Sequence, residues 1–296
     1  MRVLKWDPPE IGADVMFRIE ETMHHALGMR EADKAQHQAA QAAHYHLDCG
    51  GQRLRARLAV TSAVALEISI SDAMMLAASA ELIHNASLVH DDLVDCEEYR
   101  RGSKTVAAAF GSTVAICTGD LLLSAAYVAL GGFSRSARIP DLLRLVHHAA
   151  TAAIHGQCSE FALTPQNSDA WENYETIAKA KSGALLALPL ELAMAAADRP
   201  DFIPIARSCA EAFAIAYQIV DDINDFSKDR GDETSPACYN ALLILEAAGH
   251  GDDAFTMASE LAKKRLLESI ELAKSLPNQS GRLLATLGNE MLREIL

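Results

Sequence analysis

Two similar acidic clusters, each at the end of an apolar run of helix length, constrain the fold of this chain more than any other feature. They are Asp91-Asp92-Leu93-Val94-Asp95 and Asp221-Asp222-Ile223-Asn224-Asp225. Residues four apart lie on one face of a helix, so each cluster places like charges together at a cost of about 0.2–0.5 kcal/mol per pair. A bound cation would offset that cost, and Mg²⁺ and Ca²⁺ are the natural candidates because they take oxygen ligands. Two solvated acidic helix ends remain the alternative at this point.

The rest of the sequence favours helices, because runs with strand-like alternation are nearly absent and helical periodicity recurs. We expect Ser71-Asp72 to cap a helix that reaches Val94, and Asp252-Asp253 to cap another that carries an apolar stripe from Ala258 to Ala273. Pro140 suits the first turn of a helix that reaches Leu163. Gly- and Pro-containing breaks leave about ten or more helices, and no linker between them is long or low in complexity. The sequence therefore predicts an all-α fold with a single domain over residues 1–296.

Composition limits the partners and the location of the protein. A net charge of −14 argues against nucleic acid as a partner, because phosphate contacts need clustered Lys and Arg. Six scattered cysteines without a CxxC motif indicate a reduced, intracellular protein. The N-terminal residues lack the layout of a signal peptide, and the longest apolar stretch, 184–197, is too short to span a bilayer. We expect a soluble, cytoplasmic protein with no transmembrane segment.

Basic residues lie close to the acidic clusters in the sequence. Arg53, Arg55 and Arg57 follow Gly50-Gly51, and Arg100-Arg101 and Lys104 follow the first cluster. Lys179 and Lys181 form a third group, and Lys228 follows the second cluster. Any one such run is usually a solvated face. Together with carboxylates they favour a diphosphate site, because Mg²⁺ binds through a few carboxylates plus substrate phosphates and Arg grips phosphate oxygens in pairs.

These motifs, in this order, resemble those of the trans-isoprenyl diphosphate synthases, also called polyprenyl synthetases. Gly50-Gly51-Gln52-Arg53-Leu54-Arg55 is similar to the GGKRxR box, and residues 88–95 with Arg100-Arg101-Gly102 are similar to the first aspartate-rich motif and its trailing RRG. The later landmarks are Gly119-Asp120, Gly156-Gln157, Lys181-Ser182 and the segment 218–225. The resemblance implies a single-domain isoprenoid-synthase helical bundle around a central cavity, a homodimer, and a prenyltransferase that joins isopentenyl diphosphate to an allylic prenyl diphosphate.

The resemblance also implies roles for individual residues. Asp91 and Asp95 would hold two Mg²⁺ ions and Asp221 a third, with three further aspartates as ligands or neighbours, namely Asp92, Asp222 and Asp225. The implied contacts of the allylic diphosphate are Arg100, Lys181 and Gln218, with Ser182 oriented toward the developing cation. The implied contacts of isopentenyl diphosphate are Gln52, Arg55, His84 and Arg101. The catalytic set is then Asp91, Asp92, Asp95, Lys181, Gln218 and Asp221.

Two departures from the family pattern affect the second substrate. Gln52 stands where the box has a lysine, which removes a positive contact unless Arg53 or Arg57 replaces it. The Gly-Lys that usually follows the second motif is missing, so that Lys228 or Arg230 would have to reach the diphosphate. Two alternatives follow: an enzyme that ionises an allylic diphosphate for cyclisation or for prenyl transfer to another acceptor, or a catalytically weak regulatory subunit. The small Ala86 and Ser87, one turn before Asp91, favour a product of C20 or longer.

Overall fold

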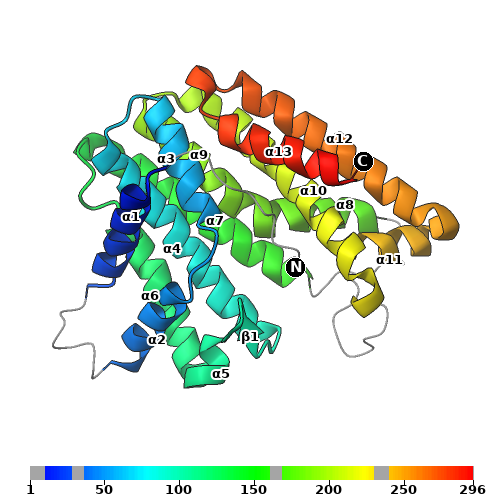
Figure 1. The fold of residues 1–296 in the computed structure, drawn as a ribbon, viewed down its shortest axis with the longest axis horizontal. Helices are drawn as coiled ribbons and strands as arrows, with labels where there is room; N and C mark the ends of the chain where they lie inside the picture. Colours follow the sequence, from blue (N-terminus) through cyan, green and yellow to red (C-terminus); the bar gives the residue numbers. More distant parts are fainter. Residues whose placement is uncertain (1–10, 29–36, 161–168, 230–239, 296) are drawn as a thin grey trace. The chain divides into compact units, whose positions relative to one another are not determined.

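Long helices form most of the part of the chain that the computed structural model describes, which is residues 11–28, 37–160, 169–229 and 240–295 (Figure 1). Shorter 3₁₀ and π segments connect several of them. The helices are α1 (Ala13–Ala26), α2 (Gln38–Asp48), α3 (Leu54–Ala65), α4 (Ile70–Val94), α5 (Val106–Phe110), α6 (Ser112–Val128), α7 (Ile139–Glu160), α8 (Ala170–Ala178), α9 (Ala184–Ala196), α10 (Ile203–Asp229), α11 (Ala241–Leu245), α12 (Ala254–Ser275) and α13 (Arg282–Ile295). The short segments are η2 (Ser136–Arg138), η3 (Lys179–Gly183), η4 (Pro200–Phe202), η5 (Glu246–His250), η6 (Gly251–Asp253) and η7 (Pro277–Gln279).

The strands in the described ranges are limited to one small antiparallel hairpin. Strand β1 (Tyr99–Arg100) pairs with β2 (Ser103–Lys104), with Arg100 opposite Ser103. The prediction of an all-α fold is confirmed. The chain divides into two compact units, residues 1–8, 148–191 and 200–296 in the first and residues 9–147 and 192–199 in the second. A single domain over residues 1–296 stays a prediction.

In the second unit, α4 is the central helix and packs against α1, α3 and α6. It is apolar on most sides, and Ala77, Ala78 and Ala80 are fully buried. Such small side chains let neighbouring helices approach closely, and a helix that is hydrophobic all round has to be enclosed by others. The helix carries the first acidic cluster at its C-terminal end. Packing of α4 in the core therefore fixes the position of that cluster within the unit.

In the first unit, α10 carries the second acidic cluster and packs against α12 and η3. The stripe predicted for α12 is buried at Ala258, Ala262, Leu266, Ile270 and Ala273.

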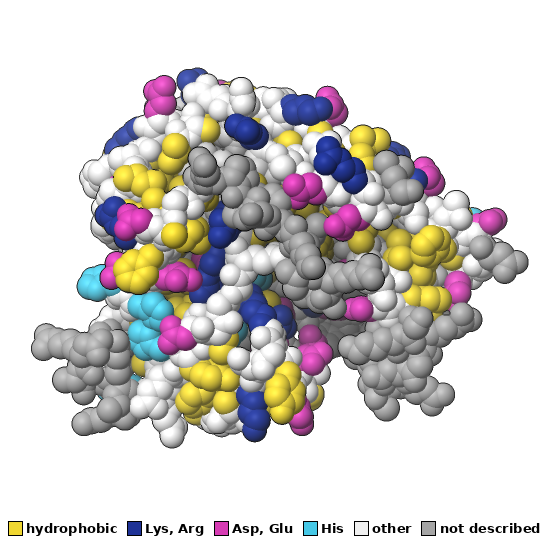
Figure 2. Space-filling model, viewed as in Figure 1, with side chains coloured by type: hydrophobic (Ala, Val, Ile, Leu, Met, Phe, Trp, Pro, Cys, Tyr) yellow, Lys and Arg dark blue, Asp and Glu magenta, His cyan; other side chains and the backbone are white. Residues whose placement is uncertain are grey.

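On the face drawn in Figure 2, basic and acidic side chains are interspersed with hydrophobic ones, and no single sign of charge dominates.

One predicted helix start was wrong, and a second was right in position but without the capping hydrogen bond. The N-cap of α4 is Ser69, whose hydroxyl accepts from the backbone N–H of Asp72, instead of Ser71-Asp72. Asp72 lies in the first turn, and its carboxylate accepts two hydrogen bonds from Ser134. Asp253 is the N-cap of α12, but its side chain makes no capping hydrogen bond. Pro140 lies in the first turn of α7, as predicted, and Leu163 lies outside the described residues.

Candidate active site

The first acidic cluster ends α4 and presents its three carboxylates differently. Asp92 is 1% exposed and accepts a hydrogen bond of 2.5 Å from Nε of Arg100, and its Oδ2 makes no hydrogen bond within the described ranges. Burial raises the pKa of Asp92, while the charge and hydrogen bond of Arg100 oppose that rise. Asp91 is half-buried and Asp95 is exposed at the helix C-cap. Asp92 is thus used inside the unit, and the chemistry of the donors fits a hard cation that takes oxygen ligands.

The Arg100-Arg101-Gly102 motif forms the tight turn of the β1–β2 hairpin. Arg101 and Gly102, the two loop residues, have φ values of 53° and 81°. Two-residue hairpin loops of this kind need positive φ at both positions, which favours glycine at the second. The turn directs the two arginines to different partners, since Arg100 binds Asp92 and Nη1 of Arg101 donates to the carbonyl of Gly50. The hairpin thereby connects the first acidic cluster to the glycine box.

Gly51 is required because the side chain of Arg101 covers its backbone. A Cβ atom at this position would lie 2.5 Å from Nη1 of Arg101, and the residue has a φ of 138°. No larger side chain fits without displacing the guanidinium. The second glycine of the box therefore leaves room for the side chain of Arg101, which lies 50 residues away in the sequence.

Arg53 is committed to the interior and does not replace the lysine missing at Gln52. It is 5% exposed, its Nε donates to Glu20 at 3.1 Å, and its Nη2 donates to the carbonyl of Leu47 at 2.6 Å. Arg57 donates from Nε to the carbonyl of Gln52 at 3.0 Å. Arg55 lies in the first turn of α3 and is half-buried.

Two histidines lie among these arginines, and burial, together with the arginine charges, lowers the pKa of both. The pKa of the half-buried His84 is well below its usual range because of its desolvation and the nearby charges of Arg55, Arg101 and Arg100. Burial, with Arg101 and Arg100, lowers the pKa of His46 to about 4. The positive charge of this cluster therefore comes from arginine. His46, on α2, was not singled out by the sequence, because no motif marks it.

The second acidic cluster also uses its middle aspartate internally. Asp222 is 5% exposed and accepts hydrogen bonds from the Tyr174 hydroxyl at 2.7 Å, the Ala241 backbone N–H at 2.8 Å and the Gln218 amide at 2.8 Å. Burial raises the pKa of Asp222 to about 7, and the three donors oppose that rise. Asp221 and Asp225 are half-buried. Gln218, expected at the allylic substrate, donates to Asp222 in this structure, so that its contact with substrate stays a prediction.

Lys181 lies on the π-helical segment η3 and pairs with Glu160, the last residue of α7. The Nζ–Oε2 distance is 2.5 Å, and both side chains are mostly buried. Ser182 is half-buried. The sequence showed neither Glu160 nor the π-helical turn. The side chain of Lys228 and the whole of Arg230 lie outside the described residues.

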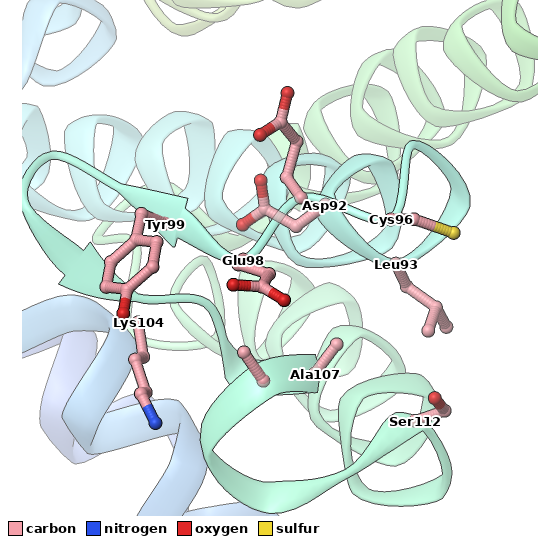
Figure 3. A pocket seen from close by; sticks show the side chains of 10 residues that line it. Asp92, Leu93, Cys96, Glu98, Tyr99, Lys104, Ala107 and Ser112 are labelled. Carbon is pink, nitrogen blue, oxygen red and sulfur yellow. The ribbon is translucent and has the colours of Figure 1, made fainter. Parts of the chain in front are cut away.

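A cavity of about 360 Å³ adjoins the first cluster (Figure 3). Its lining combines Asp92 from the last turn of α4 and Cys96 just beyond that helix with Tyr99 and Lys104 from the hairpin and Ala107 from α5. Within the described ranges, no three His, Cys, Asp or Glu side chains converge closely enough to hold a metal ion alone. Mg²⁺ does not need such a cage, since it keeps several waters and binds through one or two carboxylates plus substrate phosphates.

Among the described helices, none combines the length and hydropathy that a membrane span requires.

Comparison with known proteins gives one consistent result. A sequence model of the polyprenyl synthetase family matches residues 36–238. The chain is 29% identical to a short chain isoprenyl diphosphate synthase of Methanocaldococcus jannaschii over 229 residues, which cover 75% of this chain and 68% of that protein. It is 30% identical to a farnesyl diphosphate synthase of Bacillus subtilis over 250 residues, which cover 78% of this chain and 83% of the relative.

Solved structures agree on the fold. A decaprenyl diphosphate synthase from Rhodobacter capsulatus superposes with a TM-score of 0.80 at 18% identity, covering 96% of this chain and 97% of the other. A geranylgeranyl pyrophosphate synthetase from Pyrococcus horikoshii superposes with a TM-score of 0.76 at 24% identity, covering 95% and 97%. The chain belongs to the polyprenyl synthetase family and is a prenyltransferase, as its motifs predicted.

Proposed function

We propose that this enzyme condenses isopentenyl diphosphate head-to-tail with an allylic diphosphate in a reaction that depends on Mg²⁺. The observation that carries the proposal is the cluster of Arg55, Arg100 and Arg101 around the neutral His84, joined to the first acidic cluster by the 2.5 Å contact between Arg100 and Asp92. Arginine provides paired donors for phosphate oxygens, and carboxylates provide ligands for the cations that accompany a diphosphate. The named relatives, which include farnesyl and geranylgeranyl diphosphate synthases, support the same chemistry.

The proposed site residues fall into two groups, one for each substrate. Arg55 and Arg101 hold the diphosphate of isopentenyl diphosphate, and neutral His84 adds a hydrogen bond to it. Arg100, Lys181 and Gln218 orient the allylic diphosphate. The allylic C–O bond breaks, the double bond of isopentenyl diphosphate forms the new C–C bond, and a proton leaves to the released pyrophosphate. The reaction requires that water be kept from the allylic cation, which it would otherwise capture.

Aspartates of both clusters hold the metal in this proposal. Asp91 and Asp95 would hold two Mg²⁺ ions and Asp221 and Asp225 a third, while Asp92 and Asp222 would support these ligands from within the fold. When bound, Mg²⁺ stabilises the negative charge of the departing pyrophosphate. The oxygen-only donor set and the unpaired Oδ2 of Asp92 support a cation at the first cluster.

The small residues before Asp91 support a product of C20 or longer. Ala86 is 4% exposed and Ser87 is half-buried, and Ala80 and Ser79, on earlier turns of α4, are fully buried. None of them is large enough to stop a growing chain that passes along this helix, whose turns rise 5.4 Å each.

The active form in this proposal is a homodimer of single-domain chains. Helix α6 exposes Ile116 at 50% and Val128 at 58%, apolar side chains that a second copy would bury. Sedimentation of the purified protein checks the dimer.

The test of the function is incubation with Mg²⁺, isopentenyl diphosphate and dimethylallyl, geranyl or farnesyl diphosphate, with products identified by mass. Longer prenyl diphosphates are expected, and omitting Mg²⁺ should abolish them. Pyrophosphate release without the second substrate would instead indicate cyclisation or hydrolysis. Absence of turnover with every starter would indicate a subunit that needs an active partner, and either result would overturn the proposal.

A further inference from the structure

Glu81 is a buried carboxylate in the middle of α4 and belongs to none of the motifs above. It is 2% exposed. Its Oε2 accepts a hydrogen bond of 3.0 Å from the backbone N–H of Ala56, and its Oε1 lies 3.5 Å from the amide nitrogen of Asn85 and 3.9 Å from Nη1 of Arg53. A buried carboxylate needs such partners, because burying a charge without them is costly.

The contact with Ala56 makes Glu81 the cap of a different helix. The N-cap residue of α3 is Arg53, which has left-handed φ and ψ values of 50° and 38° and makes no side-chain capping hydrogen bond. The first N–H groups of a helix have no partner within it, and a carboxylate at that end is favoured by the helix dipole. Glu81 supplies the missing acceptor from α4. The first turn of α3, which includes Arg55, is therefore held against α4 by this side chain.

Glu81 also balances the arginines that surround it. Burial and the charge of Arg53 lower the pKa of Arg101, and the charge of Glu81 opposes that fall. Arg53 in turn connects to α1 through Glu20 and to the end of α2 through the carbonyl of Leu47. His46 and His84, which face the same arginines, are neutral and cannot take over this role.

We infer that Glu81 is a positioning residue for the second substrate: it sets Arg55, through the first turn of α3, and Arg101, through charge, in the arrangement that binds the diphosphate of isopentenyl diphosphate. The inference rests on the proposed function, because it assigns Arg55 and Arg101 to that substrate. It explains how the glycine box binds without its lysine: the remaining cations are held in a fixed arrangement by one internal carboxylate.

The direction in which KM for isopentenyl diphosphate changes distinguishes a positioning role of Glu81 from a purely electrostatic one. Glu81→Gln removes a negative charge near the diphosphate, so a purely electrostatic role predicts tighter binding and a lower KM for isopentenyl diphosphate. Loss of position predicts the opposite. We expect Glu81→Gln to raise that KM at least about tenfold, the size of effect that follows loss of a charge-assisted contact. The KM for the allylic substrate should change less than about twofold, since the residues that Glu81 contacts, Ala56, Asn85 and Arg53, are not among those proposed to bind it.

Asp72→Asn is the matched control. Asp72 is a buried carboxylate of the same helix, 6% exposed, and accepts hydrogen bonds from the N–H of Ser134 at 2.9 Å and its hydroxyl at 2.6 Å. It should cost stability without changing either KM. Glu81→Asp keeps the charge on a shorter side chain and should raise the KM for isopentenyl diphosphate by an intermediate amount. It also serves as the test variant if Glu81→Gln does not fold.

Steady-state kinetics with each substrate varied in turn measure both KM values, and thermal unfolding measures the stability of each variant. A KM for isopentenyl diphosphate that is unchanged or lower in the Glu81 variants, or equal shifts in Asp72→Asn, would overturn the inference. If the wild-type enzyme makes no longer product, the proposed function fails. Calorimetric titration of isopentenyl diphosphate into the same variants then still tests the role of Glu81, because binding is measured without turnover.

Discussion

Replacing Tyr174 with phenylalanine tests how the second acidic cluster is held. Tyr174 is fully buried, and its hydroxyl donates to Oδ2 of Asp222 at 2.7 Å. Burial raises the pKa of Asp222 to about 7, so this carboxyl is charged at pH 8.5 and protonated at pH 5.5. A hydrogen bond to a charged group contributes about 1.5–3 kcal/mol, and one between neutral groups about 0.5–1.5 kcal/mol. Tyr174→Phe should therefore lower the free energy of unfolding by about 2 kcal/mol at pH 8.5 and by about 1 kcal/mol at pH 5.5.

The direction of this pH dependence follows from linkage. A carboxyl whose pKa is higher in the folded state contributes most stability below its unfolded pKa, about 4, and loses that contribution as the pH rises through 7. Removing a donor raises the folded pKa of Asp222 further. The additional loss in Tyr174→Phe must then grow with pH.

Urea unfolding with a metal chelator present, followed by tryptophan fluorescence, measures both values. Trp171 stacks on the ring of Tyr174 with centroids 5.3 Å apart, and phenylalanine keeps that ring. Tyr45→Phe is the control, because its hydroxyl donates to the carbonyl of Lys104 at an exposed position and should show a smaller, pH-independent loss. Equal losses for Tyr174→Phe at the two pH values, or a larger one at pH 5.5, would refute the reasoning.

Three further predictions concern α7, α2 and α4. Gly156→Ala places a Cβ 2.6 Å from the backbone nitrogen of Lys181 and should cost about 1–3 kcal/mol of stability, whereas Gly119→Ala, whose Cβ would meet the movable ring of His90 at 2.1 Å, should cost less; thermal unfolding compares them. His46→Gln removes a group whose pKa falls to about 4 on folding. Because the unfolded chain takes up a proton there at higher pH than the folded one, the free energy of unfolding of the wild type should fall by on the order of 3 kcal/mol between pH 6.5 and 4, and that of the variant by less. Urea unfolding across that range tests this. Ser87→Phe should give a shorter prenyl product, which mass spectrometry of the products would detect. An unchanged product spectrum would show that the growing prenyl chain does not pass this side chain.

The helices were predictable from the sequence because the periodicity of apolar residues is a local signal. Their exact starts were less so, since Ser69 and Ser71 are both suitable caps, and the contact of Asp72 with Ser134, 62 residues away, accompanies the choice of Ser69. The β1–β2 hairpin was missed because strands of two residues leave no alternation to detect. Its turn was missed as well, because Arg101-Gly102 is not one of the Asn-Gly or Asp-Gly pairs that mark such a turn in a sequence.

The candidate site was predictable in its charged residues and not in their partners. The motifs marked Arg100 and Asp222 but gave no sign of what each would contact. Tyr174, Glu160 and Glu81 come from other helices, and spacing along the chain carries no information on contacts between distant segments. The role of Arg53 was also beyond the sequence, because only the fold shows that its guanidinium is enclosed by Glu20 and Leu47.

The internal use of both middle aspartates affects how mutagenesis of this enzyme should be interpreted. Asp92 anchors Arg100, and Asp222 anchors the beginning of α11 through the N–H of Ala241. An inactive Asp222→Ala protein would therefore not identify a metal ligand, because the same substitution releases a helix start and a buried tyrosine. Asp95, exposed at the C-cap of α4, is a better position at which to test metal affinity, because its substitution removes no buried contact of this kind.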